Sequence, residues 1–181
     1  MFTQFKPTWM VEAIYQITPD QLREQGVKAV LTDLDNTLIA WNNPDGTEEL
    51  IEWIDRMKLA DIPVIILSNN SDDRIKRVAE LLKLRYIPRA LKPFKKGFTE
   101  ASKQLQLEKH EILMVGDQIM TDIWGANRSG IRSVLVRPII DSDAWNTKIN
   151  RFFELHIMRA LIKNDPDMKW RNGIHDRNAI K

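Results

Sequence analysis

Short apolar runs alternate with longer amphipathic stretches through most of this sequence. Between the runs, apolar residues recur at helical spacing. Apolar strands separated by helices are typical of a parallel sheet with helices on both faces. The sequence therefore predicts an α/β fold, with a mainly parallel sheet between two helical layers. The runs that we expect to form strands are residues 27–31, 63–67, 86–87, 112–117 and 131–136.

Polar side chains follow four of these runs, at the point where each predicted strand ends. Because the carboxyl ends of parallel strands meet at one edge of a sheet, we expect these side chains to share one crevice. Several carboxylates in a small volume require a cation, and Mg²⁺ prefers oxygen ligands. A lysine and a serine beside that cation are suited to hold a phosphoryl group. The residues concerned are Asp33, Asp35, Ser68, Asn69, Lys92, Asp117 and Asp122.

The acid pair Asp33 and Asp35 predicts two separate roles in phosphoryl transfer. Asp33 is placed to attack phosphorus as a nucleophile. Asp35, two residues later, is placed to protonate the leaving oxygen and then to deprotonate water. With Asp117 they form the expected Mg²⁺ site, in which a main-chain carbonyl near Asp35 also takes part. Ser68, Asn69 and Lys92 are the expected phosphate ligands.

Each of these signals also has a plain structural interpretation. Asp35-Asn36-Thr37 is a common turn sequence, Ser68 is suited to cap a helix, and Lys92 before Pro93 is typical of an exposed loop. Gly116-Asp117 is an ordinary strand-to-helix turn sequence. The order in which acid pair, serine, lysine and acid close successive strands favours an active site over four independent turns.

Composition indicates a single globular domain with tails. The chain has 181 residues, of which 43% are hydrophobic, and a net charge of +2, which is too weak to indicate DNA binding. It has no cysteine, which excludes disulfides and thiolate sites. We expect an N-terminal aromatic segment over residues 1–26, a catalytic core over 27–140, and an amphipathic helix with a polar tail over 141–181.

The two flanking segments each allow two interpretations. The N-terminal residues are aromatic and apolar at irregular spacing, and we expect them to pack on the core; contact with a membrane or a partner is the alternative. The stretch from Lys148 to Lys163 predicts a basic amphipathic helix that either docks on the sheet or binds anionic lipid. The tail from Asn164 to Lys181 is polar, and we expect it to be frayed or ordered by a partner.

The motifs together resemble those of the haloacid dehalogenase superfamily of phosphatases. Asp33–Thr37 resembles the first motif, Ser68 the second, Lys92 the third, and Gly116-Asp117 with Thr121-Asp122 the fourth. The resemblance implies a Rossmann-like three-layer α/β/α fold, Mg²⁺ as cofactor, and hydrolysis of a phosphomonoester through an aspartyl-phosphate. It also implies that Thr37 and Asp122 support the site.

The resemblance narrows to the YqeG-type phosphatases of subclass IIIA. It rests on the Phe5–Trp9 start, the Asp-Asn-Thr form of the first motif, and Gly116-Asp117-Gln118 followed by Gly125–Arg128. That group is similar to mitochondrial phosphatidylglycerophosphate phosphatases, which tend to carry lysine where this chain has Leu34. The intervals after the first and second motifs leave no room for a cap domain, so we expect an open site that accepts a bulky substrate.

Three functions remain open from the sequence. The first is a phosphatase for a phospholipid head group such as phosphatidylglycerophosphate, with peripheral membrane contact. The second is a phosphatase for a soluble phosphoester or a phosphoprotein. The third is an interaction protein that uses the same fold to bind RNA or an assembly partner. We expect a cytoplasmic protein, either free or at the inner face of the membrane.

Overall fold

A six-stranded sheet forms the centre of the computed structural model, which describes residues 2–40, 46–140 and 148–175. Side chains of residues 148–152 lie outside the description. The elements, in chain order, are η1 Thr3–Phe5, β1 Trp9–Val11, η2 Ile14–Gln16, α1 Pro19–Glu24, β2 Ala29–Thr32, α2 Glu48–Leu59, β3 Val64–Leu67, α3 Asp72–Leu82, β4 Arg85–Ile87, α4 Lys95–Leu105, η3 Lys109–Glu111, β5 Ile112–Gly116, η4 Ile119–Ile123, α5 Trp124–Ser129, β6 Arg132–Val136 and α6 Lys148–Asn164.

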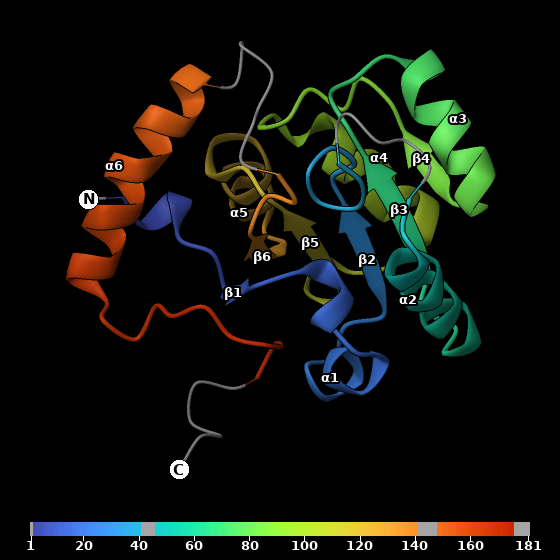
Figure 1. The fold of residues 1–181 in the computed structure, drawn as a ribbon, viewed down its shortest axis with the longest axis horizontal. Coiled ribbons are helices and arrows are strands. Elements are labelled where there is room, and N and C mark those ends of the chain that lie inside the picture. Colours follow the sequence, from blue (N-terminus) through green and yellow to red (C-terminus); the bar gives the residue numbers. More distant parts are fainter. Residues whose placement is uncertain (1, 41–45, 141–147, 176–181) are drawn as a thin grey trace.

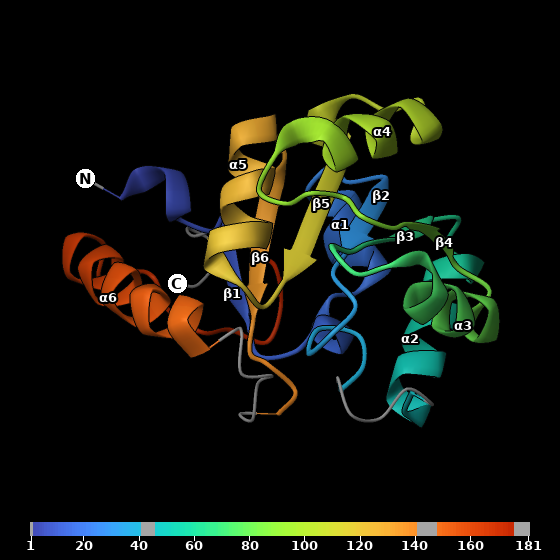
Figure 2. The ribbon, with the colours of Figure 1, turned by 90° about the horizontal axis from the view of Figure 1, so that it is seen from above.

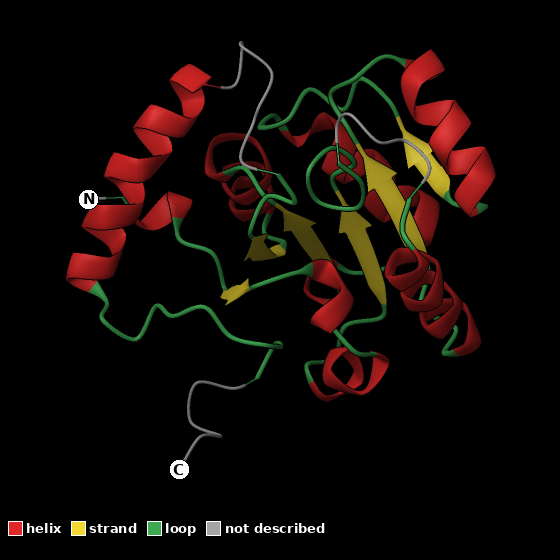
Figure 3. Cartoon of the chain, viewed as in Figure 1, coloured by secondary structure: helices red, strands yellow, loops and turns green. Residues whose placement is uncertain are grey.

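All described strand pairs are parallel, in the order β1-β6-β5-β2-β3-β4. The arrows of β2, β3 and β5 point toward the same edge of the sheet (Figure 3). The predicted α/β fold with a parallel sheet is therefore confirmed. The sequence analysis did not predict β1, because this strand has only three residues and lies within an irregular aromatic stretch.

Helices cover both faces of the sheet, which gives the predicted three layers (Figures 1 and 2). Alternate strand residues point to opposite faces, and the structure sorts them accordingly. Val30 and Ile66 pack in the cluster that includes α1, α2 and α3. Leu31 and Ile65 pack in the cluster that includes α4 and α5. Both faces are apolar, and the strands therefore read as continuous apolar runs.

Local capping explains where the first helices begin. Thr18 caps α1 through a capping box with Gln21, and Pro19 occupies the first helical position. Thr47 caps α2 by accepting a hydrogen bond from the Leu50 amide at 3.3 Å. These caps fix the starts of α1 and α2 at the residues that the sequence predicted.

The two connections in which the resemblance would allow a cap domain are short here. Between β2 and β3 the described residues contain α2 as their only helix, and between β3 and β4 they contain α3. Among the described residues, neither connection contains a further domain.

The two ends of the chain pack together on the β1 side of the sheet. Phe5 and Met10 share a buried cluster with Ile157 and Leu161 of α6, and Figure 1 shows α6 beside the N-terminal segment. The N-terminal aromatic segment therefore contributes buried side chains to this cluster. In the part of the chain that is described, no helix has both the length and the hydrophobicity to cross a membrane.

The expectation of a frayed tail is wrong for the described residues up to His175. The amide of Arg171 donates to the Met10 carbonyl at 3.0 Å, and the Glu12 amide donates to the Arg171 carbonyl at 3.1 Å. Ile174 is fully buried. The tail therefore runs beside β1 and satisfies its outer edge. Residues 176–181 lie outside the described chain.

We predict that Gly97→Ala destabilises the protein. A Cβ at residue 97 would lie 2.7 Å from the Ala90 Cβ and 2.9 Å from the Ala90 carbonyl oxygen. A Gly-to-Ala change inside a helix normally stabilises by roughly 0.5–1 kcal/mol, so this contact reverses the usual sign. We expect the free energy of unfolding to fall by about 1–3 kcal/mol in urea titration. Gln104→Ala, at an exposed position of the same helix, is the matched control and should change it little; a stabilised Gly97→Ala would contradict this packing.

Candidate active site

The strand order changes direction between β2 and β5. From β2 the chain adds β3 and β4 on one side of the sheet, and then returns to add β5 and β6 on the other. Ligands of open α/β sheets bind at such a switch point, outside the carboxyl ends of the strands. Asp33 directly follows β2 and Asp117 directly follows β5, so the two carboxylates emerge on either side of this point.

A tight loop after β2 holds Asp33 in place. The Asp33 amide donates to the Val115 carbonyl at 3.0 Å, which extends the pairing of β2 with β5 by one residue. Asn36 adopts a left-handed conformation with φ 62°, and its amide donates to the Ile39 carbonyl at 2.7 Å. Asparagine tolerates this conformation better than most residues. The loop turns back on itself at once, and Asp33 stays at the sheet edge.

Lys92 is buried between two carboxylates. Its Nζ donates to Asp33 Oδ1 and to Asp122 Oδ1, each at 2.7 Å. The main chain of Lys92 is held as well: its amide donates to Asn69 Oδ1 at 2.7 Å, and its carbonyl accepts from Asn69 Nδ2 at 2.9 Å. Asn69, which the sequence predicted as a phosphate ligand, therefore uses both ends of its amide to position the lysine.

Asp122 is held tightly by the η4 turn. Its Oδ2 accepts from the Gln118 amide at 3.1 Å, and its Oδ1 accepts from Thr121 Oγ1 at 3.3 Å. The residue is buried against Gly116, where any Cβ would approach Asp122 Oδ2 to 2.3 Å. Only glycine at position 116 leaves room for this carboxylate. The Gly116-Asp117 motif thus combines one carboxylate of this edge with the space for a second one, that of Asp122.

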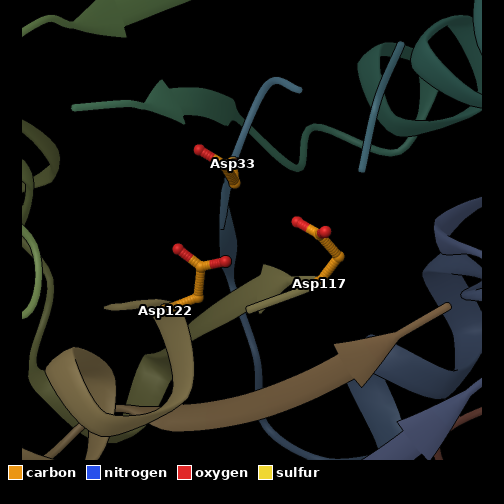
Figure 4. Close-up of side chains that lie close together, drawn as sticks. All are labelled: Asp33, Asp117 and Asp122. Atoms are coloured by element: carbon orange, nitrogen blue, oxygen red, sulfur yellow. The ribbon is translucent and has the colours of Figure 1, made fainter. Parts of the chain in front are cut away.

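Three buried carboxylates lie together at this edge. Asp33, Asp117 and Asp122 each offer an oxygen within 4.8 Å of the others, and Figure 4 shows these side chains close together on three different segments. Thr37, predicted as a supporting residue, donates its hydroxyl to Asp117 Oδ1 at 3.2 Å. Hard oxygen ligands in such a cluster suit a divalent cation. The donor set therefore fits a divalent cation.

The electrostatics of the cluster support the same conclusion. Burial raises the pKa of Asp33 from 3.8 to about 7; Lys92 opposes this shift, whereas Asp122 and Asp117 add to it. Burial alone would lower the pKa of Lys92, but Asp122 and Asp33 raise it above its ordinary value. Lys92 therefore stays protonated at neutral pH. Asp33, in the absence of a metal ion, has its pKa near neutrality.

Asp35 lies apart from the carboxylate cluster. Its Oδ2 accepts from Asn70 Nδ2 at 2.5 Å, and its Oδ1 pairs with Arg74 of α3 at 2.6 Å. The structure thus brings Asp33, Asp117, Asp122 and Lys92 together, and it turns the side chain of Asp35 toward the end of β3. The sequence analysis had included Asp35 among the metal ligands.

Ser68 is buried at the end of β3, where its Oγ accepts from the Asn70 amide at 3.2 Å. Sequence reasoning missed Asn70 and Arg74, the two partners of Asp35. Asn70 carried a weak signal as the third polar residue after β3, but Arg74 is one of several cations on α3 and had none.

The η4 turn, which carries Asp122, also contacts the C-terminal helix α6. Glu154 of α6 is 5% exposed and accepts from the Met120 amide of η4 at 3.0 Å. A buried carboxylate at that amide ties α6 to the turn that carries Asp122. Sequence reasoning missed this link as well, because it depends on a contact over 34 residues of chain.

Comparison with known proteins gives relatives over most of the chain. "Probable phosphatase YqeG" of Bacillus subtilis is 42% identical over 166 residues, which cover 92% of this chain and 96% of that protein. "Phosphatidylglycerophosphate phosphatase 1, chloroplastic/mitochondrial" of Arabidopsis thaliana is 29% identical over 142 residues, which cover 74% of this chain but 41% of the plant protein.

A solved structure shares the fold. The cobalt-bound deoxy-D-mannose-octulosonate 8-phosphate phosphatase of Haemophilus influenzae aligns with a TM-score of 0.51 at 16% identity, over 77% of this chain and 91% of that one. The family model of the haloacid dehalogenase-like hydrolases matches residues 2–130. With the parallel sheet, the acidic switch point and the 42% identical relative, this match shows that the chain belongs to the haloacid dehalogenase-like hydrolase family.

Proposed function

We propose that this phosphatase is a Mg²⁺-dependent phosphomonoesterase that works through an aspartyl-phosphate on Asp33. The observation that carries the proposal is the buried Lys92 held between Asp33 and Asp122, with Asp117 beside them, at the switch point of the sheet. This arrangement brings a carboxylate, a fixed cation and further oxygen ligands into one small volume, which supports the proposal.

Asp33 and Asp117 are the side chains that would hold Mg²⁺. Both oxygens of Asp122 already accept hydrogen bonds from its neighbours, so we assign Asp122 to the positioning of Lys92. The Asp35 carboxylate points toward Asn70 and Arg74. We therefore assign the Mg²⁺ contact of residue 35 to its main-chain carbonyl oxygen. The ion would supply positive charge to the phosphoryl oxygens and favour the ionised form of Asp33.

In the first step, a carboxylate oxygen of Asp33 attacks phosphorus and the bond to the ester oxygen breaks. Asp35 gives its proton to the leaving oxygen. In the second step, Asp35 takes a proton from water, the water oxygen attacks phosphorus, and the Asp33–phosphorus bond breaks to release phosphate. Lys92 and the hydroxyl of Ser68 bind the phosphoryl oxygens in both steps.

Asp35 reaches the leaving group only after it exchanges a partner. Asn70 and Arg74 occupy one oxygen each, so one of these donors has to give way to the ester oxygen. The Arg74 side chain is 45% exposed, which leaves it room to move. Asn69 takes part indirectly, because it holds the main chain of Lys92.

Phosphatidylglycerophosphate is the substrate that we propose first. The absence of a cap among the described residues suits a head group presented by a large assembly, and the Arabidopsis relative is named for this substrate. We expect release of phosphate from this lipid in mixed micelles to exceed release from soluble phosphomonoesters, with complete loss on chelation of the metal. A preference for soluble esters would contradict the lipid assignment and leave the chemistry intact.

The variant Asp33→Asn should abolish turnover while the protein stays folded. Asparagine keeps the shape of the side chain but is no nucleophile, and Lys92 retains its contact with Asp122. We expect kcat to fall by about 10³-fold or more, which corresponds to ~4 kcal/mol of barrier. Phosphate release measures the loss, and thermal unfolding checks the fold. A folded variant with wild-type turnover would overturn the proposed nucleophile.

Metal binding should become tighter as the pH rises through about 7, the raised pKa of Asp33. Because Mg²⁺ needs the carboxylate, it has to displace a proton below that pH. Without metal, the stability contributed by protonated Asp33 is fully present below its unfolded pKa of 3.8 and is lost as the pH rises to about 7. We therefore expect the Mg²⁺-induced rise in Tm to be larger at the alkaline side of neutrality than at the acidic side.

The control for this pH dependence is Asp33→Asn, which carries no proton at this position. Its Tm should respond to Mg²⁺ weakly and with little change across the same pH range. An equal Mg²⁺-induced rise in wild-type Tm on both sides of neutrality would show that Asp33 does not titrate against the metal.

A further inference from the structure

The segment that carries Lys92 has an unusual surface. Leu91 is 52% exposed and Phe94 is 60% exposed, on either side of a lysine that is almost wholly buried. The exposed side chains around them are Arg89, Lys95 and Lys96, and residues 85–96 contain no aspartate or glutamate. We call residues 89–96 the rim. It interleaves cations with exposed apolar side chains.

Local folding preferences do not account for the two apolar residues. Leu91 has φ 56°, a left-handed conformation that favours glycine or asparagine and costs a leucine roughly 1 kcal/mol. Phe94 is the N-cap of α4 and makes no side-chain cap, although serine or aspartate would be favoured there. Both positions thus carry large apolar side chains where a polar residue would fold at least as well.

Packing within the protein does not explain why Leu91 and Phe94 are large, because both side chains are more than half exposed. Phe94 lies under the guanidinium of Arg128 at 5.8 Å from its ring centroid, which brings a further cation to the rim. Ile139, from the segment after β6, is 41% exposed, and its amide donates to the Asn36 carbonyl in the Asp33 loop at 3.0 Å. Exposed apolar groups therefore come from two segments next to the catalytic loops.

We propose that the rim docks on an anionic phospholipid bilayer, so that the site opens onto the head groups. The proposal rests on the proposed function and names the form in which the substrate is presented. Apolar side chains enter the interface while the cations meet lipid phosphates. Docking would place Leu91 and Phe94 in the interfacial layer, and Lys92 follows Leu91 directly in the chain. A phosphomonoester head group would then reach Asp33 without leaving the membrane.

The outer face of α6 is the competing surface. Leu155 is 58% exposed and Ile162 is 41% exposed, with Arg159 and Lys163 exposed nearby. This face resembles the rim in composition, but its buried side packs on the N-terminal segment and on η4 rather than on the nucleophile loop. It therefore provides a matched control, in which two of the three exposed large apolar side chains in the described part of α6 are replaced; the third is Phe153.

The test is co-sedimentation with vesicles of phosphatidylglycerol and phosphatidylcholine, or of phosphatidylcholine alone. We compare the wild type with Leu91→Asn/Phe94→Ser and with Leu155→Asn/Ile162→Ser, each in the full chain. We expect the wild type to bind the anionic vesicles, and the rim variant to lose about tenfold or more of its partition coefficient. The α6 variant should bind as the wild type does.

Folding is checked on the same samples. Because asparagine suits the backbone of residue 91 and serine suits the N-cap of α4, the Tm of the rim variant should equal or exceed that of the wild type. A lower Tm would show that the apolar side chains serve folding, which would overturn the argument for docking. Loss of vesicle binding in the α6 variant alone would move the membrane surface to α6.

Failure of the docking proposal can be told apart from failure of the proposed function. Sedimentation is repeated with Asp33→Asn, which should bind vesicles as the wild type does, because binding needs no turnover. Metal-dependent hydrolysis of soluble esters without vesicle binding overturns the rim alone. A dimer in solution that the rim variant converts to a monomer would assign the rim to a second copy of the chain instead.

Discussion

The ammonium group of Lys92, enclosed between the carboxylates of Asp33 and Asp122, is the interaction on which the rest of the site depends. Charges removed from water are costly unless each one is paired and hydrogen-bonded. Here one ammonium pairs with two carboxylates, and the main chain of Lys92 is held by two hydrogen bonds to Asn69. Removal of the ammonium would leave the buried carboxylates without their cation.

Two glycines allow the close packing of the backbone that this cluster needs, in addition to the pairing of its charges. Gly116 makes room for Asp122, and Gly97 lets α4 approach Ala90, just before Lys92. Four separate segments of chain, after β2, β3, β4 and β5, therefore meet at one edge of the sheet. The same short connections leave that edge without a cap domain in the described chain. In our proposal the rim, rather than a cap, therefore contacts the surface that presents the substrate.

The catalytic cluster and the rim follow from one geometric fact: Lys92 points inward while its neighbours point outward. Within the segment, buried and exposed residues alternate between Ala90, Leu91 and Lys92. A chain that must present a charge to the interior from an edge loop exposes the adjacent side chains. Core packing does not determine whether these exposed side chains are polar or apolar. Here Leu91 and Phe94 are apolar.

Periodicity and strand-end polarity were sufficient to predict the parallel sheet and the helices, and to place Asp33, Ser68 and Asp117 directly after strands, because each of these signals is local. Strand β1 and the tail beside it were not predicted, since a three-residue strand has no period and its partner Val134 lies far along the chain. Three features depend on contacts between segments that only folding brings together. They are the orientation of the Asp35 side chain toward Asn70, the hydrogen bonds of the Asn69 amide to the main chain of Lys92, and the packing of Asp122 against Gly116. Sequence therefore specifies which chemical groups arrive at the edge, whereas long-range packing decides which of them face one another.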